Sequence, residues 1–229
     1  MTPLPSDAIR PGMEIGTADG ERGTLGLLVR RADSPGQVYG LSCSHVIAES
    51  GRAAVDSIVE HPVDRFALPS SLEAGRLTEF CSRLAAKGGG ENTDDFALFQ
   101  LTKPSSPAHV VSGEVATAVS HRRANEILKG TRTWMAGAAT VNGSFGVVTS
   151  FTQKRLLVQP LPAVGAATFV DVVRYETVCR PGDSGAAVLE EGSNVVLGLH
   201  FASDPVHGVG YFLPLGEFFE RHGLSLVTA

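Results

Sequence analysis

Cysteine is scarce in this sequence, and no motif is built from it. Three of the 229 residues are cysteines, Cys43, Cys81 and Cys179, and none of them forms a CxxC pair. An odd number of cysteines without paired spacing indicates neither a disulfide framework nor a structural zinc site. We therefore expect free thiols and a reducing compartment, the cytoplasm.

Long apolar runs and an excess of positive charge are also missing. No segment approaches the roughly 18 consecutive apolar residues that a membrane span needs. The opening residues, MTPLPSDAIRPG, lack the basic segment and apolar core of a secretory signal. The formal net charge is −5, and the lysines and arginines are scattered. We expect neither a membrane nor a nucleic acid as a partner.

Signatures of bound cofactors and metals are absent from the sequence as well. The glycine-rich residues 87–90 (KGGG) are not followed by the Gly-Lys-Ser/Thr of a phosphate-binding loop. The sequence has no HExxH motif and no cluster of carboxylates. We expect no cofactor and no metal. Five histidines lack ligand spacing and are expected to be structural or at the surface: His61, His109, His121, His207 and His222.

What the sequence does contain is the pattern of an all-β protein. Its apolar runs are short, rich in Val, Leu, Phe and Thr, and broken by Gly, Pro, Asn and Asp. Near the end, LGEFFERHG places Leu215, Phe218 and Phe219 on one helical face, which predicts a short C-terminal helix. The predicted strands are residues 23–30, 38–42, 53–59, 74–80, 96–101, 131–136, 139–142, 146–151, 155–159, 167–175, 186–189, 195–201 and 210–213.

The predicted strands fall into two groups. Residues 103–124 have the weakest periodicity and include a Pro-Ser-Ser-Pro stretch. They separate two sets of about six strands, each the size of a small β-barrel. We predict an N-terminal segment at residues 1–22, a first barrel at 23–105, a linker at 106–124, and a second barrel with the helix at 125–229.

Three short motifs supply the side chains of a nucleophilic site. SHVIA delivers His45 at the end of a predicted strand, DDFALF places an acid at the head of another, and RPGDSG holds Ser184 between glycines. A hydroxyl is a poor nucleophile at neutral pH, so it needs a base in hydrogen-bond reach and a third group that fixes the base's tautomer. Histidine suits the first role and a buried carboxylate the second.

Several neighbours of these motifs have roles to be assigned. Asp94 and Asp95 compete for the carboxylate role, because adjacent strand residues point to opposite faces. A glycine before the serine lets the backbone curl so that the amides of Gly182 and Ser184 face one point, as stabilisation of an oxyanion requires. Cys43 lies close to His45 in sequence, and we expect it to be packed rather than nucleophilic.

At these residues the sequence resembles the trypsin-like (chymotrypsin-fold) serine peptidases, in their compact bacterial form. The resemblance rests on SHVIA, DFAL, GDSG and the following VVLGLHF, and on spacings of 50 residues from His45 to Asp95 and 89 from Asp95 to Ser184. It covers the chain from about Gly23 to Phe219. The order His, Asp, Ser argues against an α/β-hydrolase, whose order is Ser, acid, His.

The resemblance implies a fold, an activity and roles for residues. It implies two six-stranded antiparallel barrels with the site between them, and a serine endopeptidase working through an acyl-enzyme. His45 would be the base and Ser184 the nucleophile, and the family pattern selects Asp95 as the orienting acid. The alternative is a peptidase-fold module that binds peptides but hydrolyses them poorly; an esterase using the same three residues is a further possibility.

Substrate binding is also implied by the resemblance. The strand after the serine would pair with a protein or peptide substrate through Phe201, Ala202 and Ser203. His200 occupies the position where relatives selecting Glu or Gln carry a histidine, which predicts such a preference before the cut, unless His200 is only packed. Val178 provides no countercharge for a basic side chain, so cleavage after Arg or Lys is not expected.

The acid beside the serine, Asp183, is expected to brace the oxyanion turn from inside. A buried carboxylate needs a partner, and Arg180 is the nearest candidate in the sequence. The sequence has no Ile-Val-Gly-Gly-like start that would supply one. If Asp183 lacks a partner in the resting state, we expect a latent enzyme that is ordered by an activating partner of unknown identity.

Overall fold

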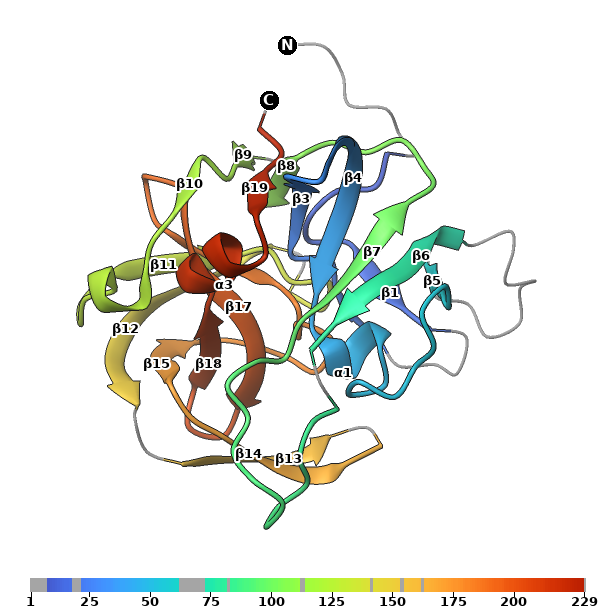
Figure 1. The fold of residues 1–229 in the computed structure, drawn as a ribbon. Helices are drawn as coiled ribbons and strands as arrows, with labels where there is room; N and C mark the ends of the chain where they lie inside the picture. Colours follow the sequence, from blue (N-terminus) through green and yellow to red (C-terminus); the bar gives the residue numbers. More distant parts are fainter. Residues whose placement is uncertain are drawn as a thin grey trace.

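The structure is a computed structural model, and it describes residues 8–17, 22–61, 73–81, 83–111, 114–140, 142–152, 155–161 and 163–228. The chain is mostly β-structure, as predicted (Figure 1). Its described helices are short, α1 (Ser44–Ile47) and α3 (Gly216–Arg221), with one 3-10 turn at Ala124–Glu126. The predicted C-terminal helix is α3. None of the helices in the described ranges is long and apolar enough to cross a bilayer.

The first half of the chain forms an eight-stranded antiparallel sheet in the order β19-β3-β4-β7-β6-β5-β1-β2. Its strands are β1 (Glu14–Gly16), β2 (Arg22–Thr24), β3 (Leu27–Arg31), β4 (Ser34–Ser42), β5 (Ile58–Glu60), β6 (Glu73–Phe80), β7 (Ala97–Leu101) and β19 (Leu224–Leu226). Only Leu25 and Gly26 separate β2, which pairs with β1, from β3, which pairs with β4. This short segment links β2, at one end of the sheet, to β3, next to the other end, so the sheet is curled. No pairing among the described residues closes it into a ring, so this half is a curled sheet where a six-stranded barrel was predicted.

The second half forms the predicted six-stranded barrel. Its sheet has the order β10-β17-β16-β11-β12-β15-β18, and β18 also pairs with β17. This pairing closes six strands into a ring, namely β11, β12, β15, β18, β17 and β16. The strands are β10 (Ser120–His121), β11 (Arg132–Met135), β12 (Ser144–Thr152), β15 (Val172–Thr177), β16 (Ala187–Glu190), β17 (Val195–Asp204) and β18 (Val209–Pro214).

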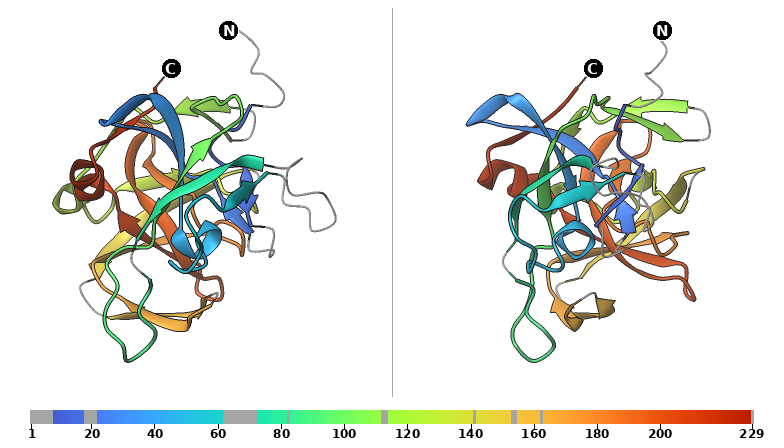
Figure 2. Two further views of the ribbon diagram at one scale, coloured as in Figure 1. Left: turned by 45° about the vertical axis from the view of Figure 1, so that its right-hand side comes forward. Right: turned by 90° about the vertical axis from the view of Figure 1, so that its right-hand side faces the viewer.

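Two hairpins stand outside these sheets, β8 (Ala108–Val111) with β9 (Glu114–Thr117), and β13 (Leu156–Leu161) with β14 (Gly165–Phe169). The second hairpin lies beside the connection from β6 to β7 at one end of the molecule (Figure 2). Isolated bridges join Ala86 to Ala167 and Asn92 to Phe169. The first and second halves therefore contact each other through loops as well as through sheets.

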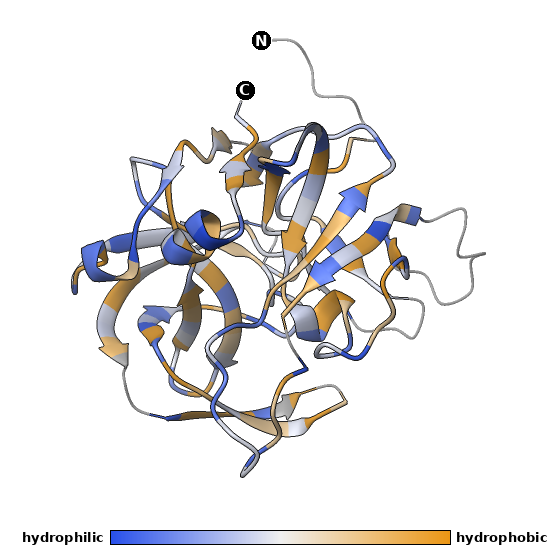
Figure 3. Cartoon of the chain, in the orientation of Figure 1, coloured by the Kyte–Doolittle hydropathy of each residue, from blue (hydrophilic) through white to orange (hydrophobic). Residues whose placement is uncertain are grey.

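A single buried cluster connects the two halves. It contains Leu41 and Phe99 from the first sheet together with Leu189 and Leu199 from the second. Apolar residues recur along the strands (Figure 3), and β4 and β17 are buried over four and six consecutive residues. Because the core is shared, the halves cannot shift against each other without opening apolar surface to water.

The observed strands differ from the predicted boundaries at several places. β1 lies in the predicted N-terminal segment, the hairpin β8–β9 and strand β10 lie in the predicted linker, and β19 returns from the C-terminus to the first sheet. Of the predicted strand at residues 139–142, Ala139, Thr140 and Asn142 are not in a strand, and the amides of Ala139 and Thr140 bond to Asp183 instead. Residue 141 lies outside the described residues. Short strands paired with distant segments leave little local periodicity from which to predict them.

His109, on β8, is a buried polar residue without a polar neighbour. Its side chain is enclosed, and its ring meets that of Trp134 edge-on at 5.6 Å between centroids. Neither ring nitrogen has a hydrogen-bond partner among the described residues. Burial lowers the pKa of His109 from 6.5 to about 4, because an imidazolium ion would be charged in an apolar core.

Replacing His109 with leucine should make the fold less sensitive to acid. Above pH 6.5, His109 is neutral in both the folded and the unfolded chain, so its burial carries no protonation cost. As the pH falls towards 4, only the unfolded chain binds the proton, and the free energy of unfolding decreases. The loss amounts to about 3 kcal/mol over this window. Urea unfolding at pH 7 and pH 4.5 should show a smaller difference for His109→Leu than for the wild type. The exposed His207→Gln is the control; equal pH dependence of all three proteins would contradict the assignment.

Candidate active site

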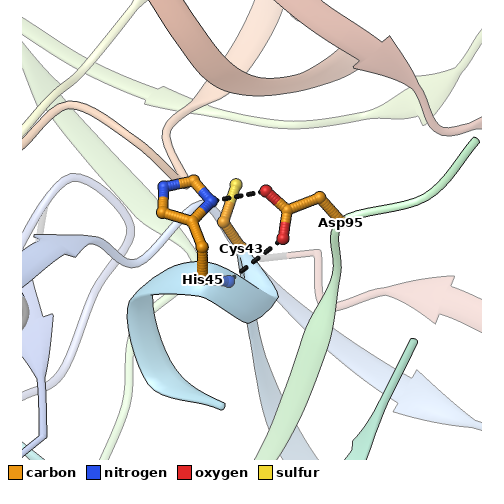
Figure 4. A group of neighbouring side chains, drawn as sticks. All are labelled: Cys43, His45 and Asp95. Carbon is orange, nitrogen blue, oxygen red and sulfur yellow. Dashed lines mark hydrogen bonds and ion pairs between the residues drawn. The ribbon is translucent and has the colours of Figure 1, made fainter. Parts of the chain in front are cut away.

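His45 and Asp95 are placed side by side by strand pairing. β4 ends at Ser42, which pairs with Ala97 at the start of β7, so α1 and the residue before β7 are neighbours. The Asp95 carboxylate accepts a hydrogen bond from the His45 amide at 3.0 Å through one oxygen and contacts His45 Nδ1 through the other (Figure 4). Asp95 is 1 % exposed. Its two contacts hold the imidazole with Nδ1 as the donor, which leaves Nε2 as the basic nitrogen.

The neighbouring Asp94 faces another way. Its carboxylate lies 3.5 Å from Arg221 and accepts a hydrogen bond from the Thr93 hydroxyl. This is the alternation expected of adjacent residues at a strand end. Between the two candidate acids, the one selected by the family pattern, Asp95, is the one that contacts His45.

The turn that carries Ser184 is anchored on the first sheet, next to His45. The Thr24 amide donates to Ser184 O at 2.7 Å, and the Thr24 hydroxyl donates to Gly182 O at 2.8 Å. His200 O accepts bonds from the Gly185 amide at 2.8 Å and from Cys43 Sγ at 3.4 Å. Cys43 directly precedes α1, so these bonds connect the serine turn with the start of the helix that carries His45.

The backbone of the turn depends on two glycines. Gly182 has φ +104° and Gly185 has φ +94°, values that residues with a Cβ rarely adopt. Within the turn, the Asp183 amide donates to Arg180 O and the Gly185 amide to His200 O. Across the described part of the chain, no backbone acceptor is found for the amides of Gly182 and Ser184. Every second amide of the turn is thus bonded within the protein, and the amides of Gly182 and Ser184 are available to a ligand.

Asp183 is buried, and its carboxylate is fully bonded. It accepts hydrogen bonds from the amides of Ala139 (3.1 Å), Thr140 (3.0 Å) and Arg180 (2.8 Å), and it also contacts the Thr140 hydroxyl. The predicted partner, Arg180, therefore contributes its backbone amide and not its guanidinium, and the residue is exposed. Backbone amides stabilise a buried carboxylate without adding a second charge.

His200 lies beneath the turn and contacts Tyr175. The Tyr175 hydroxyl is 2.9 Å from His200 Nδ1, and the His200 side chain is almost entirely buried. Burial is the main cause that lowers the pKa of His200 to about 4, Asp183 raises it and His45 lowers it further. At neutral pH the imidazole is therefore uncharged. Tyr175 is a neighbour that sequence reasoning missed.

The remaining predicted substrate residues lie along one strand edge and at a surface position. β17 pairs with β16 only as far as Leu199, so one edge of Phe201, Ala202 and Ser203 has no partner strand in the described ranges. Phe201 is buried, Ser203 is exposed, and Phe201 O lies 3.5 Å from the Ser184 hydroxyl. Val178, at the end of β15, is 65 % exposed.

Cys43 and Cys81 are buried near the same carboxylate. Burial and then the charge of Asp95 raise the pKa of the Cys43 thiol well above its ordinary value, and the same two causes raise that of Cys81 to about 11. Both therefore remain thiols at neutral pH, which agrees with a packed rather than a nucleophilic Cys43. All three cysteines are free.

Sequence reasoning also missed Gly137, Thr24 and Thr140. A Cβ on Gly137 would lie 2.1 Å from Asp183 Oδ1, so only glycine allows the carboxylate to approach the Ala139 and Thr140 amides. Thr24 and Thr140 hold the serine turn from segments 158 and 43 residues away. The small residues of GAAT gave the only signal, since they are typical of a close backbone approach.

Comparison with known proteins gives a fold and no close relative. No family model matches the chain, and no curated protein does. Among solved structures, protease A of Thermobifida fusca is 19% identical (TM-score 0.67) and covers 97% of this chain and 100% of its own. Nocardiopsis protease is 17% identical (TM-score 0.67), and the match covers 96% of this chain and 100% of that protease. A glutamic acid specific serine protease said to use a novel histidine triad in substrate binding is 19% identical (TM-score 0.66; 96% and 100%). The chain thus has the chymotrypsin-like fold, as predicted.

A methyl group at Gly137 should displace Asp183 and weaken both the fold and the site. We expect Gly137→Ala to lower the free energy of unfolding by about 1–3 kcal/mol, the usual cost of overpacking, and to slow covalent labelling of Ser184 by an active-site reagent. Gly36→Ala is the matched control, because a Cβ there meets nothing within 4 Å. Wild-type stability and labelling in Gly137→Ala would refute the bracing role.

Proposed function

We propose that this chain is a serine endopeptidase with Ser184 as nucleophile, His45 as general base and Asp95 as the carboxylate that orients the base. The observation that carries the proposal is the buried His45–Asp95 pair next to the first sheet, to which the serine turn is also anchored through Thr24. Similarity of fold to proteases adds support, although fold alone does not determine function.

The proposed chemistry gives each donor and acceptor one role. His45 Nε2 takes the hydroxyl proton as Ser184 Oγ attacks the scissile carbonyl, and Asp95 stabilises the resulting imidazolium. The carbonyl oxygen gains negative charge and binds the amides of Gly182 and Ser184. His45 then gives its proton to the leaving amine, and water repeats the sequence to release the acyl group from Ser184.

The substrate backbone would bind as an added strand on β17. The unpaired edge at residues 201–203 presents backbone groups to an extended peptide, which supports pairing through Phe201, Ala202 and Ser203. A cavity of about 260 Å³ lies between β13 and the outer part of β17, lined by Leu157, Ala202 and Tyr211 among others. It offers room for a side chain further along the same peptide.

The side chain before the cut would be glutamine more readily than glutamate. We assign the Tyr175 hydroxyl as donor to His200 Nδ1, a stronger acceptor than its other neighbour, Met135 Sδ at 3.4 Å. His200 Nε2 then carries the ring hydrogen and can donate to a carbonyl oxygen. The imidazole is uncharged at neutral pH, so a glutamate carboxylate would be buried without a countercharge. The exposed Val178 supplies no acid for a basic residue. The glutamate-specific protease of similar fold uses histidines in substrate binding, whereas here Nδ1 contacts a tyrosine.

A latent enzyme was expected only if Asp183 lacked a partner. Asp183 accepts hydrogen bonds from four donors, so we expect activity without an added factor. The cytoplasmic location stays a prediction, which cell fractionation tests.

A fluorophosphonate probe should label the purified chain on Ser184, without any activator. Labelling requires a hydroxyl activated by a base, so it should be absent in Ser184→Ala and strongly reduced in His45→Ala. Ser225→Ala, which removes an exposed hydroxyl on β19, away from the site, should label normally. Absence of labelling in the wild type under any condition would favour the peptide-binding module. Hydrolysis of esters but not of amides would favour the esterase.

Replacing Asp95 with asparagine should lower kcat by roughly 10⁴-fold, because the amide favours the wrong tautomer of His45. The matched control is Asp94→Asn, which removes the same charge one residue away and should retain most activity. Equal losses in the two variants, measured with a peptide substrate, would show that general charge rather than orientation matters.

A peptide-library profile should show cleavage after glutamine, with glutamate second. Tyr175→Phe removes only the hydroxyl that orients His200, and it should lower kcat/KM for a glutamine substrate about five- to tenfold, the value of one hydrogen bond. Tyr39→Phe makes the same change in the first sheet and should have no such effect. Cleavage after Arg or Lys would contradict the assignment of the pocket. An unchanged kcat/KM in Tyr175→Phe would mean that His200 is only packed.

A further inference from the structure

Three buried side chains of types that bind metals lie close together, and one of them is the proposed catalytic histidine. Cys43 Sγ, a His45 ring nitrogen and an Asp95 carboxylate oxygen all lie within 4.8 Å of one another, and all three residues are buried. In Figure 4 the sulfur lies beside the imidazole and the carboxylate, on the side where His45 Nδ1 meets Asp95. No metal is expected from the sequence, because these residues form no metal-binding motif: Asp95 is 50 residues from His45.

The chemistry of this donor set fits Zn²⁺. Zinc binds thiolate, imidazole and carboxylate together, with three protein ligands and a fourth position left for water. At tetrahedral zinc the ligand atoms are separated by roughly 3.5 Å. The three atoms lie within 4.8 Å of one another, and the direct contact between His45 Nδ1 and Asp95 must lengthen to admit the ion. One thiolate and one carboxylate neutralise the dication, which removes the main cost of burying it.

We propose that Zn²⁺ binds Cys43 Sγ, His45 Nδ1 and an Asp95 oxygen, and so switches off the peptidase. On binding, the thiol loses its proton to solvent and the sulfur forms a bond to zinc. The proton of His45 Nδ1 leaves, the zinc takes its place, and Nε2 acquires a proton, so the imidazole stays neutral. No oxidant or reductant is involved. The His45 side chain, 9 % exposed, forms the outer edge of the cluster and gives the ion a route in.

The inhibition follows from the proton positions and rests on the proposed function. With zinc on Nδ1 and a proton on Nε2, His45 cannot accept the Ser184 proton, and Asp95 is no longer free to stabilise an imidazolium. None of the three ligands is among the residues assigned to substrate pairing, and only Cys43 contacts β17, through its bond to His200 O. Zinc should therefore lower kcat more than it raises KM.

Binding is tested first without reference to activity. The full chain, stripped of metal, is titrated with Co²⁺, and a thiolate-to-cobalt charge-transfer band is expected in the near ultraviolet and is expected to disappear on adding Zn²⁺. Cys43→Ser, which keeps the size of the side chain, should give no band, and thermal unfolding verifies that it folds. The control Cys81→Ser removes the other buried thiol near Asp95 and should keep the band. A missing band in the wild type, or a band kept by Cys43→Ser, would overturn the site.

Inhibition is then measured with a peptide substrate at buffered free Zn²⁺, each protein being compared with its own metal-free rate. Cys43→Ser should need more than about 100-fold more zinc than the wild type, since even loss of an outer-shell partner costs 10–100-fold in affinity. Cys81→Ser should match the wild type. A cobalt band without inhibition would overturn the switch and keep the site. No hydrolysis in metal-free buffer would instead count against the proposed function, whatever the band shows.

Discussion

The bond from the Thr24 amide to Ser184 O joins the two halves of this chain at the point where their functional residues meet. Thr24 ends β2, the edge strand of the first sheet, and Ser184 lies in the turn before β16. Everything proposed for the site requires that this contact be held to within a fraction of an ångström, since nucleophile and base come from different sheets. The shared core and the bonds from Cys43 and Gly185 to His200 O also hold the two halves in this position.

Asp183 explains how the turn keeps its shape. A carboxylate inside the protein is stable only when its oxygens are bonded, and here backbone amides and a hydroxyl bond it without any opposite charge. The turn is therefore fixed by a local feature of the fold. An arrangement that uses no salt bridge is also insensitive to ionic strength, because dipoles at contact distance are little screened by salt.

Much of the site could be predicted from short motifs, because each functional residue lies at the end of a strand with recognisable neighbours. His45 in SHVIA, Asp95 in DFAL and Ser184 in GDSG carry their own context. What could not be predicted are contacts between distant segments: Thr24 with the serine turn, Thr140 with Asp183, Tyr175 with His200, and β19 with the first sheet. Nearness in sequence did point to Arg180 as the partner of Asp183, and the atom involved proved to be its amide.

The central claim is that Ser184 forms a covalent intermediate with the help of His45. Intact-mass spectrometry of the chain, quenched within the first turnover of a glutamine-containing peptide ester, measures this directly. The account predicts a mass increase equal to the acyl group, mapped by digestion to Ser184 and absent when His45 is replaced by alanine. Steady release of product from an enzyme that is never acylated, or an acyl group found on Cys43, would contradict it.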